Sequence, residues 1–192
     1  MTISALRILS IAAIFLLTAC LPQQTSAAEL DGVTLPDTLT IGGKHFSLNG
    51  LGIRKATIFG IRVYVAGLYL MKRSTNADEI LDSSEPKYLL MQLVRTISRD
   101  DIVDAWESGL EKNVENPEPY ILQLNAVTTP MADVKPGERI GVLFESSSVQ
   151  LETPGNKKFR VNGPGFGKAL LSIWLGENPP NRALKRGLLG LE

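Results

Sequence analysis

Alternating apolar and polar positions dominate the first half of the chain and predict strands. In residues 61–66 the apolar Ile61, Val63 and Val65 alternate with Arg62, Tyr64 and Ala66, which is the period of a strand with one buried face. The surrounding segment 53–71 is rich in β-branched and aromatic residues and predicts one long strand, which starts after a break in the pattern at residues 49–52. Residues 88–96 are apolar on both faces, which is typical of a strand in the middle of a covered sheet.

Shorter strands are predicted on either side of this region. Residues 38–48 contain two apolar runs around Gly42-Gly43, and a double glycine in that place predicts a hairpin. Residues 139–145, 148–152 and 157–161 predict three further strands.

Apolar residues at helical spacing predict helices to cover this sheet. After Ser98, a candidate N-cap, apolar residues recur every fourth position from Ile102 to Val114. The same spacing predicts helices over residues 120–127 and 166–174, with Gly176 ending the latter, and a last short helix over residues 182–189. The predicted fold class is α+β, an antiparallel β-sheet with helices packed on one face.

The first 28 residues have the pattern of an export signal. An apolar stretch from Ile8 to Ala19 follows Arg7 and is too short to span a bilayer. Two processing routes remain open: acylation of Cys20 at a lipobox after a signal of residues 1–19, which would anchor the protein to a membrane, or cleavage near Ala28. We expect a signal at residues 1–28, one domain at residues 29–192, and residence in the periplasm or cell envelope.

Composition excludes several classes of function. The chain has 20 basic and 20 acidic residues and no basic block, which argues against nucleic acid as a partner. A single cysteine and a single histidine exclude a disulfide, a Ser-His triad of ordinary composition and a structural zinc site, so we expect no metal and no cofactor. One alternative is that His45 serves as an axial haem ligand, although a histidine beside a hairpin turn is usually exposed.

Residues 48–70 carry a specific resemblance. The glycine-flanked pair Gly52 and Arg54, followed by Gly67-Leu68-Tyr69-Leu70 at the end of a strand, resembles the motif of the chalcone isomerase-like family. Residues 166–176 and 188–190 are similar to the bacterial, exported branch of that family. The resemblance implies an open-faced β-sandwich from about residue 30 onward, in a fold that hosts both an isomerase and non-catalytic ligand-binding proteins.

The same resemblance indicates site residues. In the isomerase, the arginine at the position of Arg54 meets the negative oxygen of a chalcone, and a guanidinium suits that task because it gives two parallel hydrogen bonds to an oxyanion. Tyr64 falls near the position of a threonine that the isomerase also uses. The tyrosine on the isomerase's first long helix has no counterpart in residues 98–114, which offer Trp106 instead. No catalytic residue is therefore assigned, with Arg54 the candidate if the protein is an isomerase.

We predict a non-catalytic binder of a small amphipathic acid, such as a fatty acid. Its ligand-binding residues would be Arg54, Tyr64 and Asn113. The alternatives are an intramolecular lyase of the chalcone-to-flavanone type and a haem-binding or scaffold protein of the envelope. Each single residue also has a structural alternative. Arg54 would anchor a strand end through a carboxylate partner, and one of Tyr64 and Tyr69 would belong to the core. The tryptophans at helical spacing would also be core residues, and Arg62 and Arg95 would only be surface charges.

Overall fold

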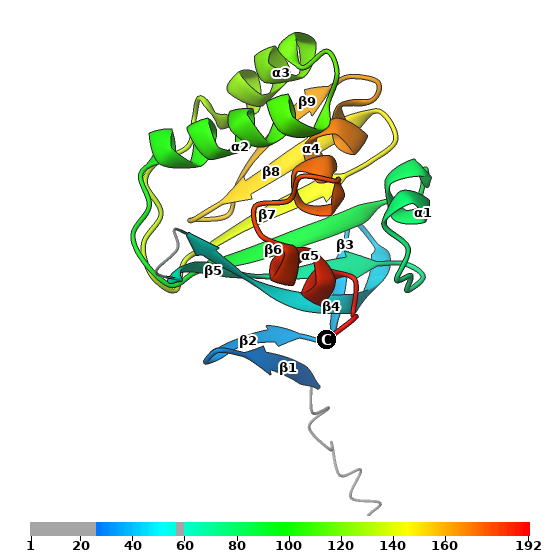
Figure 1. Cartoon of the computed structure of the whole chain (residues 1–192), viewed down its shortest axis with the longest axis vertical. Helices are drawn as coiled ribbons and strands as arrows, with labels where there is room; N and C mark the ends of the chain where they lie inside the picture. The colour runs from blue at the N-terminus through cyan, green and yellow to red at the C-terminus, as the bar shows by residue number, and fades with distance from the viewer. Residues whose placement is uncertain (1–25, 57–59) are drawn as a thin grey trace, which may run out of the picture.

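A curled antiparallel sheet of seven strands forms the centre of the molecule (Figure 1). The computed structural model describes residues 26–56 and 60–192, so Cys20 and most of the predicted signal lie outside the described residues. Each strand is hydrogen-bonded to its neighbours in chain order. The strands are β3 (Thr38–Ile41), β4 (Lys44–Ala56), β5 (Ile61–Leu70), β6 (Lys87–Leu93), β7 (Arg139–Phe144), β8 (Ser148–Thr153) and β9 (Lys157–Asn162).

The central strand of this sheet is β6, as its sequence predicts. It lies fourth in the seven-stranded order, between β5 and β7. Leu89 and Met91 point into one apolar cluster, whereas Tyr88 and Leu90 point into another on the opposite face. Both faces of β6 are therefore covered, which explains why its sequence does not alternate between apolar and polar residues.

Helices cover one face of the sheet, and they bury the larger of the two clusters (Figure 1). The α+β class with helices on one face is thus confirmed. No helix in the described part of the chain is long and apolar enough to cross a membrane. The helices are α1 (Ala77–Asp82), α2 (Arg99–Asn113), α3 (Glu118–Thr128), α4 (Phe166–Leu175) and α5 (Arg182–Leu188).

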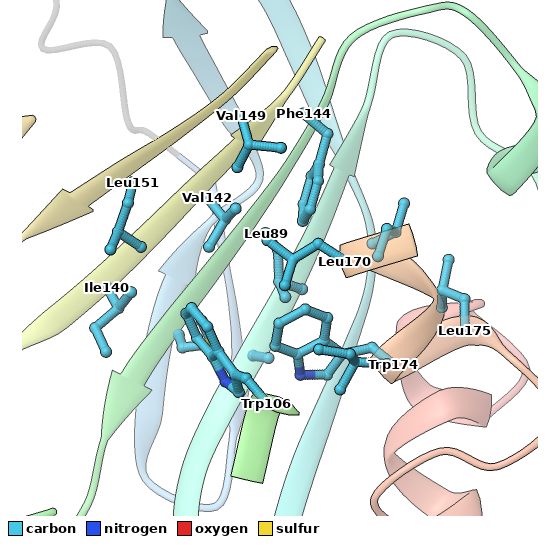
Figure 2. Packing of buried hydrophobic residues seen from close by; sticks show 14 of the residues in the cluster. Leu89, Trp106, Ile140, Val142, Phe144, Val149, Leu151, Leu170, Trp174 and Leu175 are labelled. Atoms are coloured by element: carbon cyan, nitrogen blue, oxygen red, sulfur yellow. The ribbon is translucent and has the colours of Figure 1, made fainter. Parts of the chain in front are cut away.

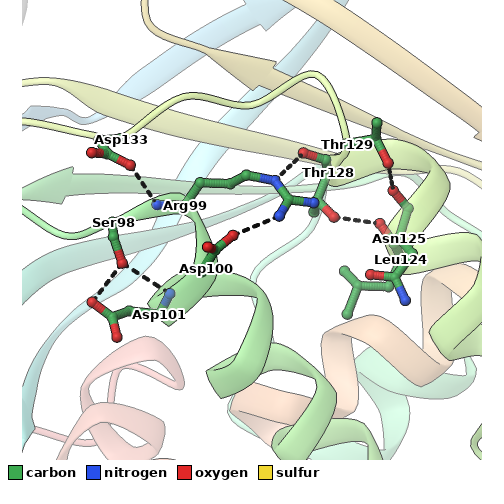
Figure 3. Close-up of polar contacts among 9 residues, drawn as sticks. All are labelled: Ser98, Arg99, Asp100, Asp101, Leu124, Asn125, Thr128, Thr129 and Asp133. Atoms are coloured by element: carbon green, nitrogen blue, oxygen red, sulfur yellow. Dashed lines mark hydrogen bonds and ion pairs between the residues drawn. The ribbon is translucent and has the colours of Figure 1, made fainter.

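The beginning of α2 is held by a group of polar contacts (Figure 3). The hydroxyl of Ser98 accepts a hydrogen bond from the backbone N–H of Asp101 at 3.1 Å, which confirms the predicted N-cap. The backbone N–H of Arg99 donates to the carboxylate of Asp133 at 2.9 Å, and its side-chain Nε donates to the carbonyl of Thr128 at 3.3 Å. These bonds hold the start of α2 against the end of α3 and the segment that follows it.

A separate hairpin of β1 (Ala27–Leu30) and β2 (Val33–Pro36) covers the other face of the sheet. The sequence analysis did not predict it. Its turn is Asp31-Gly32, both with positive φ (54° and 77°), which is the Asp-Gly signal of a tight hairpin. Val33 and Leu35 of β2 are buried against the sheet, so this face has a closed apolar core.

The prediction of one long strand over residues 53–71, after a break at residues 49–52, is wrong. Strand β4 runs through the supposed break with a shift in register between Leu48 and Gly50, and the run is divided because Ala56 of β4 pairs with Ile61 of β5. The glycines serve close packing rather than a turn: a Cβ on Gly52 would lie 2.5 Å from the carbonyl oxygen of Leu184 on α5. Glycine here lets a helix approach a strand.

Candidate functional site

A cavity of about 490 Å³ lies between the helix-covered face of the sheet and helices α2 and α4. Its lining comes from β4, β5, β6, β7, α2 and α4, from the segment after β6, and from the loop of residues 178–180 between α4 and α5. Most of the inner wall is apolar, and the apolar residues include Met91, Leu93, Ile97, Ile102, Trp106, Ile140, Ile173 and Trp174. Ligand sites in proteins are typically cavities of roughly 300–1,000 Å³ with mainly apolar walls, and this cavity has both properties.

Two tryptophans form part of that wall (Figure 2). Trp106 of α2 and Trp174 of α4 meet edge to face, with ring centroids 5.5 Å apart and planes at 77°. Both are buried in the core, as their spacing predicts, and both also line the cavity. The indole N–H of Trp174 donates to the hydroxyl oxygen of Tyr64 at 2.9 Å, so the wall carries one polar group that is already held in place.

Tyr64 therefore presents an oriented hydroxyl in the cavity. Burial raises its pKa to about 12, although the hydrogen bond from Trp174 and the positive charge of Arg54 lower it. At neutral pH the phenol is protonated. Since a hydroxyl that accepts one bond still carries its own proton, Tyr64 can donate to a ligand.

Arg54 lies beside Tyr64, because these two residues are directly paired between β4 and β5. Arg54 is a half-buried lining residue of the cavity, and its Nη1 donates to the backbone carbonyl of Lys55. Arg54 lies near the end of β4. The sequence analysis had placed it at the start of a long strand, and that placement is wrong. Within residues 26–56 and 60–192, no salt bridge includes Arg54.

More cations than carboxylates line the cavity. Arg95, which follows β6, and Lys112, on α2, are exposed lining residues, and Asp101 is the acidic residue among the described ones. The sequence analysis treated Arg95 as a surface charge and did not single out Lys112. A signal for Lys112 exists, because it continues the helix face of Asp101, Ala105 and Ser108 at intervals of three to four residues.

Asn113 does not line the cavity with Arg54 and Tyr64. Its Oδ1 accepts from the backbone N–H of Asn178 at 2.9 Å, while its Nδ2 donates to the carbonyls of Asn178 (3.1 Å) and Gly109 (2.9 Å). In return, the side chain of Asn178 donates to the carbonyl of Lys112 at 2.8 Å. Asn113 thus fastens the loop of residues 178–180, which lines the cavity, to the end of α2.

Three other residues from the sequence analysis lie away from the cavity. Tyr69 is fully buried on the opposite face, where its hydroxyl donates to the carbonyl of Pro36 at 2.8 Å. His45 is exposed on the β3–β4 hairpin, 3.0 Å from the hydroxyl of Thr40, and is not a lining residue. Arg62 forms an ion pair with Asp31 at 2.7 Å.

Comparison with known proteins agrees with this architecture. No curated protein matches the chain in sequence. In structure it is similar to a fatty-acid binding protein of Arabidopsis thaliana, with a TM-score of 0.69 and 16% identity over 85% of this chain and 96% of that one. At that identity the likeness is one of fold. The chalcone isomerase-like family matches residues 27–190, the whole of the sheet and its helices, so the chain belongs to the chalcone isomerase-like family, as its motif predicts.

Proposed function

We propose that this protein binds a small amphipathic carboxylate of the fatty-acid class and does not transform it. The observation that carries the proposal is the pairing of Arg54 and Tyr64 in an otherwise mostly apolar cavity. A fixed cation and a neutral hydroxyl side by side suit a carboxylate head group, and the apolar wall suits a hydrocarbon tail.

The energetics favour a charged head group at this position. Arg54 lines the cavity and has no salt bridge among the described residues, so a ligand carboxylate would supply a charged partner for its guanidinium. Hydrogen bonds to charged groups contribute about 1.5–3 kcal/mol. The tail would lie along the apolar part of the cavity wall, which includes Trp106, Met91 and Leu93.

The name of the Arabidopsis protein points to the same class of ligand. That protein is described as a fatty-acid binding protein and shares the fold over most of both chains. It supports a fatty acid as the first ligand to test.

Native mass spectrometry of the protein purified from its own host, with organic extraction of whatever co-purifies, tests the proposal. We expect a mass increment that corresponds to a fatty acid and that disappears after extraction. A haem in its place would favour the haem-carrier alternative, and a protein that stays empty when fatty acid is added would refute the proposal.

Isomerase activity is not expected. Helix α2 carries Trp106 and no tyrosine, so the hydroxyl that the isomerase carries on its first long helix is missing. A positioned general acid or hydrogen-bond donor contributes roughly 100-fold or more to a rate, and its loss predicts no cyclisation of a hydroxychalcone above the solution rate. Turnover that is lost in Arg54→Ala would contradict this and make the protein an enzyme.

We propose further that the protein is exported to the periplasm or envelope, on the basis of the apolar stretch from Ile8 to Ala19. If the lipobox is used, radiolabelled palmitate enters the wild-type protein and fails to enter Cys20→Ser. Absence of label from the wild type would favour cleavage near Ala28 instead.

A further inference from the structure

The exposed part of the cavity lining carries two cations that the binding of a carboxylate by Arg54 and Tyr64 does not require. Arg95 and Lys112 are exposed there, and no salt bridge in the described part of the chain includes either of them. They come from different elements, the segment after β6 and the last turn of α2. Two exposed cations and one exposed carboxylate, that of Asp101, thus line the same open cavity, so its exposed lining carries a net positive charge.

An exposed apolar side chain lies at the same end of the sheet. Ile61, the first residue of β5, is 42% exposed. It pairs with Ala56 of β4, and directly paired residues of antiparallel strands point to the same face of a sheet. Ala56 lines the cavity and Ile61 does not, so Ile61 is an exposed apolar residue on the cavity's face of the sheet, outside the lining.

We propose that this rim, defined as Ile61, Arg95 and Lys112, docks on an anionic lipid bilayer. The inference rests on the proposed function, since docking is argued from the opening of the ligand cavity. Cations beside an opening that leads to an apolar cavity complement a surface of anionic head groups above hydrocarbon. An amphipathic acid could then pass between bilayer and cavity with little exposure of its tail to water.

The expected size of the effect follows from the charges. A Lys or Arg near an anionic bilayer contributes about fivefold to membrane partitioning, so the two cations together contribute roughly 25-fold. Because this attraction is screened within about 10 Å at 0.1 M salt, binding should weaken as salt is added. Ile61 should add roughly threefold to tenfold through burial at the interface.

The other end of β5 offers a matched control. Met71, just past the end of the strand, is 45% exposed, and Lys72 and Arg73 beside it are exposed as well. The salt bridges between described residues include neither of these two cations. One end of the strand can therefore be compared with the other at the same number of cations and nearly equal apolar exposure.

The experiment is co-sedimentation of the full chain, as isolated from its host, with vesicles of phosphatidylcholine alone or mixed with phosphatidylglycerol. Every variant shares the same N-terminal segment, so differences between variants report the rim. We expect Arg95→Gln/Lys112→Gln to lose roughly 25-fold of the binding to anionic vesicles, and Ile61→Ser to lose roughly threefold to tenfold. The controls Lys72→Gln/Arg73→Gln and Met71→Ser should bind like the wild type.

Equal binding of the wild type to anionic and neutral vesicles would overturn the docking proposal, as would an equal or larger loss in the control variants. Titration of palmitate without vesicles, followed by tryptophan fluorescence, tests the proposed function separately. Ile61→Ser should bind palmitate like the wild type, because Ile61 does not line the cavity. Absence of palmitate binding by the wild type would refute the proposed function, whereas the vesicle comparison alone decides docking.

Discussion

Tyr64 and Tyr69 are two tyrosines on one strand whose surroundings differ completely. They stand five positions apart on β5, so they point to opposite faces of the sheet. Tyr69 is fully buried beneath the β1–β2 hairpin, and its hydroxyl donates to the carbonyl of Pro36 at 2.8 Å. Tyr64 is half-buried beneath α2 and α4, and its hydroxyl accepts from Trp174 in the wall of a cavity.

The cover on each face explains the difference. The β1–β2 hairpin packs directly on the sheet and closes an apolar cluster that includes Tyr69, Tyr88 and Phe46. Over the other face, the edge-to-face indoles of Trp106 and Trp174 fill the space between helices and sheet only in part, and the cavity remains beside them. One face of the same strand therefore serves stability, and we expect the other to serve binding.

The largest expected effect is on stability at the closed face. Tyr69→Ala removes a fully buried ring and should lower the free energy of unfolding by about 3–5 kcal/mol. Its folded fraction should still bind palmitate with wild-type affinity, since Tyr69 is on the face opposite the cavity. Urea denaturation followed by titration of the folded protein measures both. If Tyr64→Ala destabilised the protein as much as Tyr69→Ala, the assignment of stability to one face and binding to the other would be wrong.

High pH should destabilise the protein through tyrosines on both faces. Burial raises the pKa of Tyr64 from 10.0 to about 12, and it also raises that of Tyr69. Between these values the unfolded state has lost the proton and the folded state keeps it, so the contribution of Tyr64 is complete below pH 10 and is lost as pH rises to about 12. For Tyr64 the loss is about 2–3 kcal/mol.

Denaturation midpoints measured from pH 8 to pH 12 test this. The wild type should keep its stability up to about pH 10 and then lose it, and Tyr64→Phe should fall less steeply because it has no phenol to titrate. Parallel curves for the two proteins would show that the hydroxyl of Tyr64 is not protected from water.

Sequence patterns predicted the elements in which each face has the same kind of environment, buried or exposed, from one end to the other. The central strand β6 and the helices α2 and α4 were recognised from the spacing of their apolar residues. Their bounds agree with the prediction within a few residues. The N-cap at Ser98 and the end of α4 at Gly176 were predicted for the same reason, because capping involves only near neighbours.

Features that depend on distant partners were missed. The glycines of residues 49–52 looked like a break because the approach of α5 to β4 is invisible in the sequence. Asn113 was expected to face the ligand, yet its amide is used by Asn178, a partner 65 residues away. The β1–β2 hairpin could have been predicted, since Asp31-Gly32 between two short apolar segments is a turn signal.

The smallest expected effect is on affinity at the open face. Tyr64→Phe should weaken palmitate binding by roughly twofold to tenfold, because it removes one hydrogen bond worth about 0.5–1.5 kcal/mol. Tyr69→Phe is the matched control on the same strand and should leave the affinity unchanged. A loss of affinity in Tyr69→Phe but not in Tyr64→Phe would reverse the assignment of the two faces.

Calorimetric titration with palmitate, beside thermal melts of the same ligand-free proteins, tests the central claim most directly. The proteins are the wild type, Arg54→Ala, Arg54→Lys and the control Arg62→Ala, whose arginine pairs with Asp31 and does not line the cavity. We predict that Arg54→Ala binds roughly tenfold to a hundredfold more weakly with a nearly unchanged Tm. Arg54→Lys should recover only part of the affinity, since an ammonium lacks the bidentate fork, and Arg62→Ala should bind like the wild type. Unaltered affinity in Arg54→Ala together with a large drop in its Tm would show that Arg54 is structural and would contradict the account.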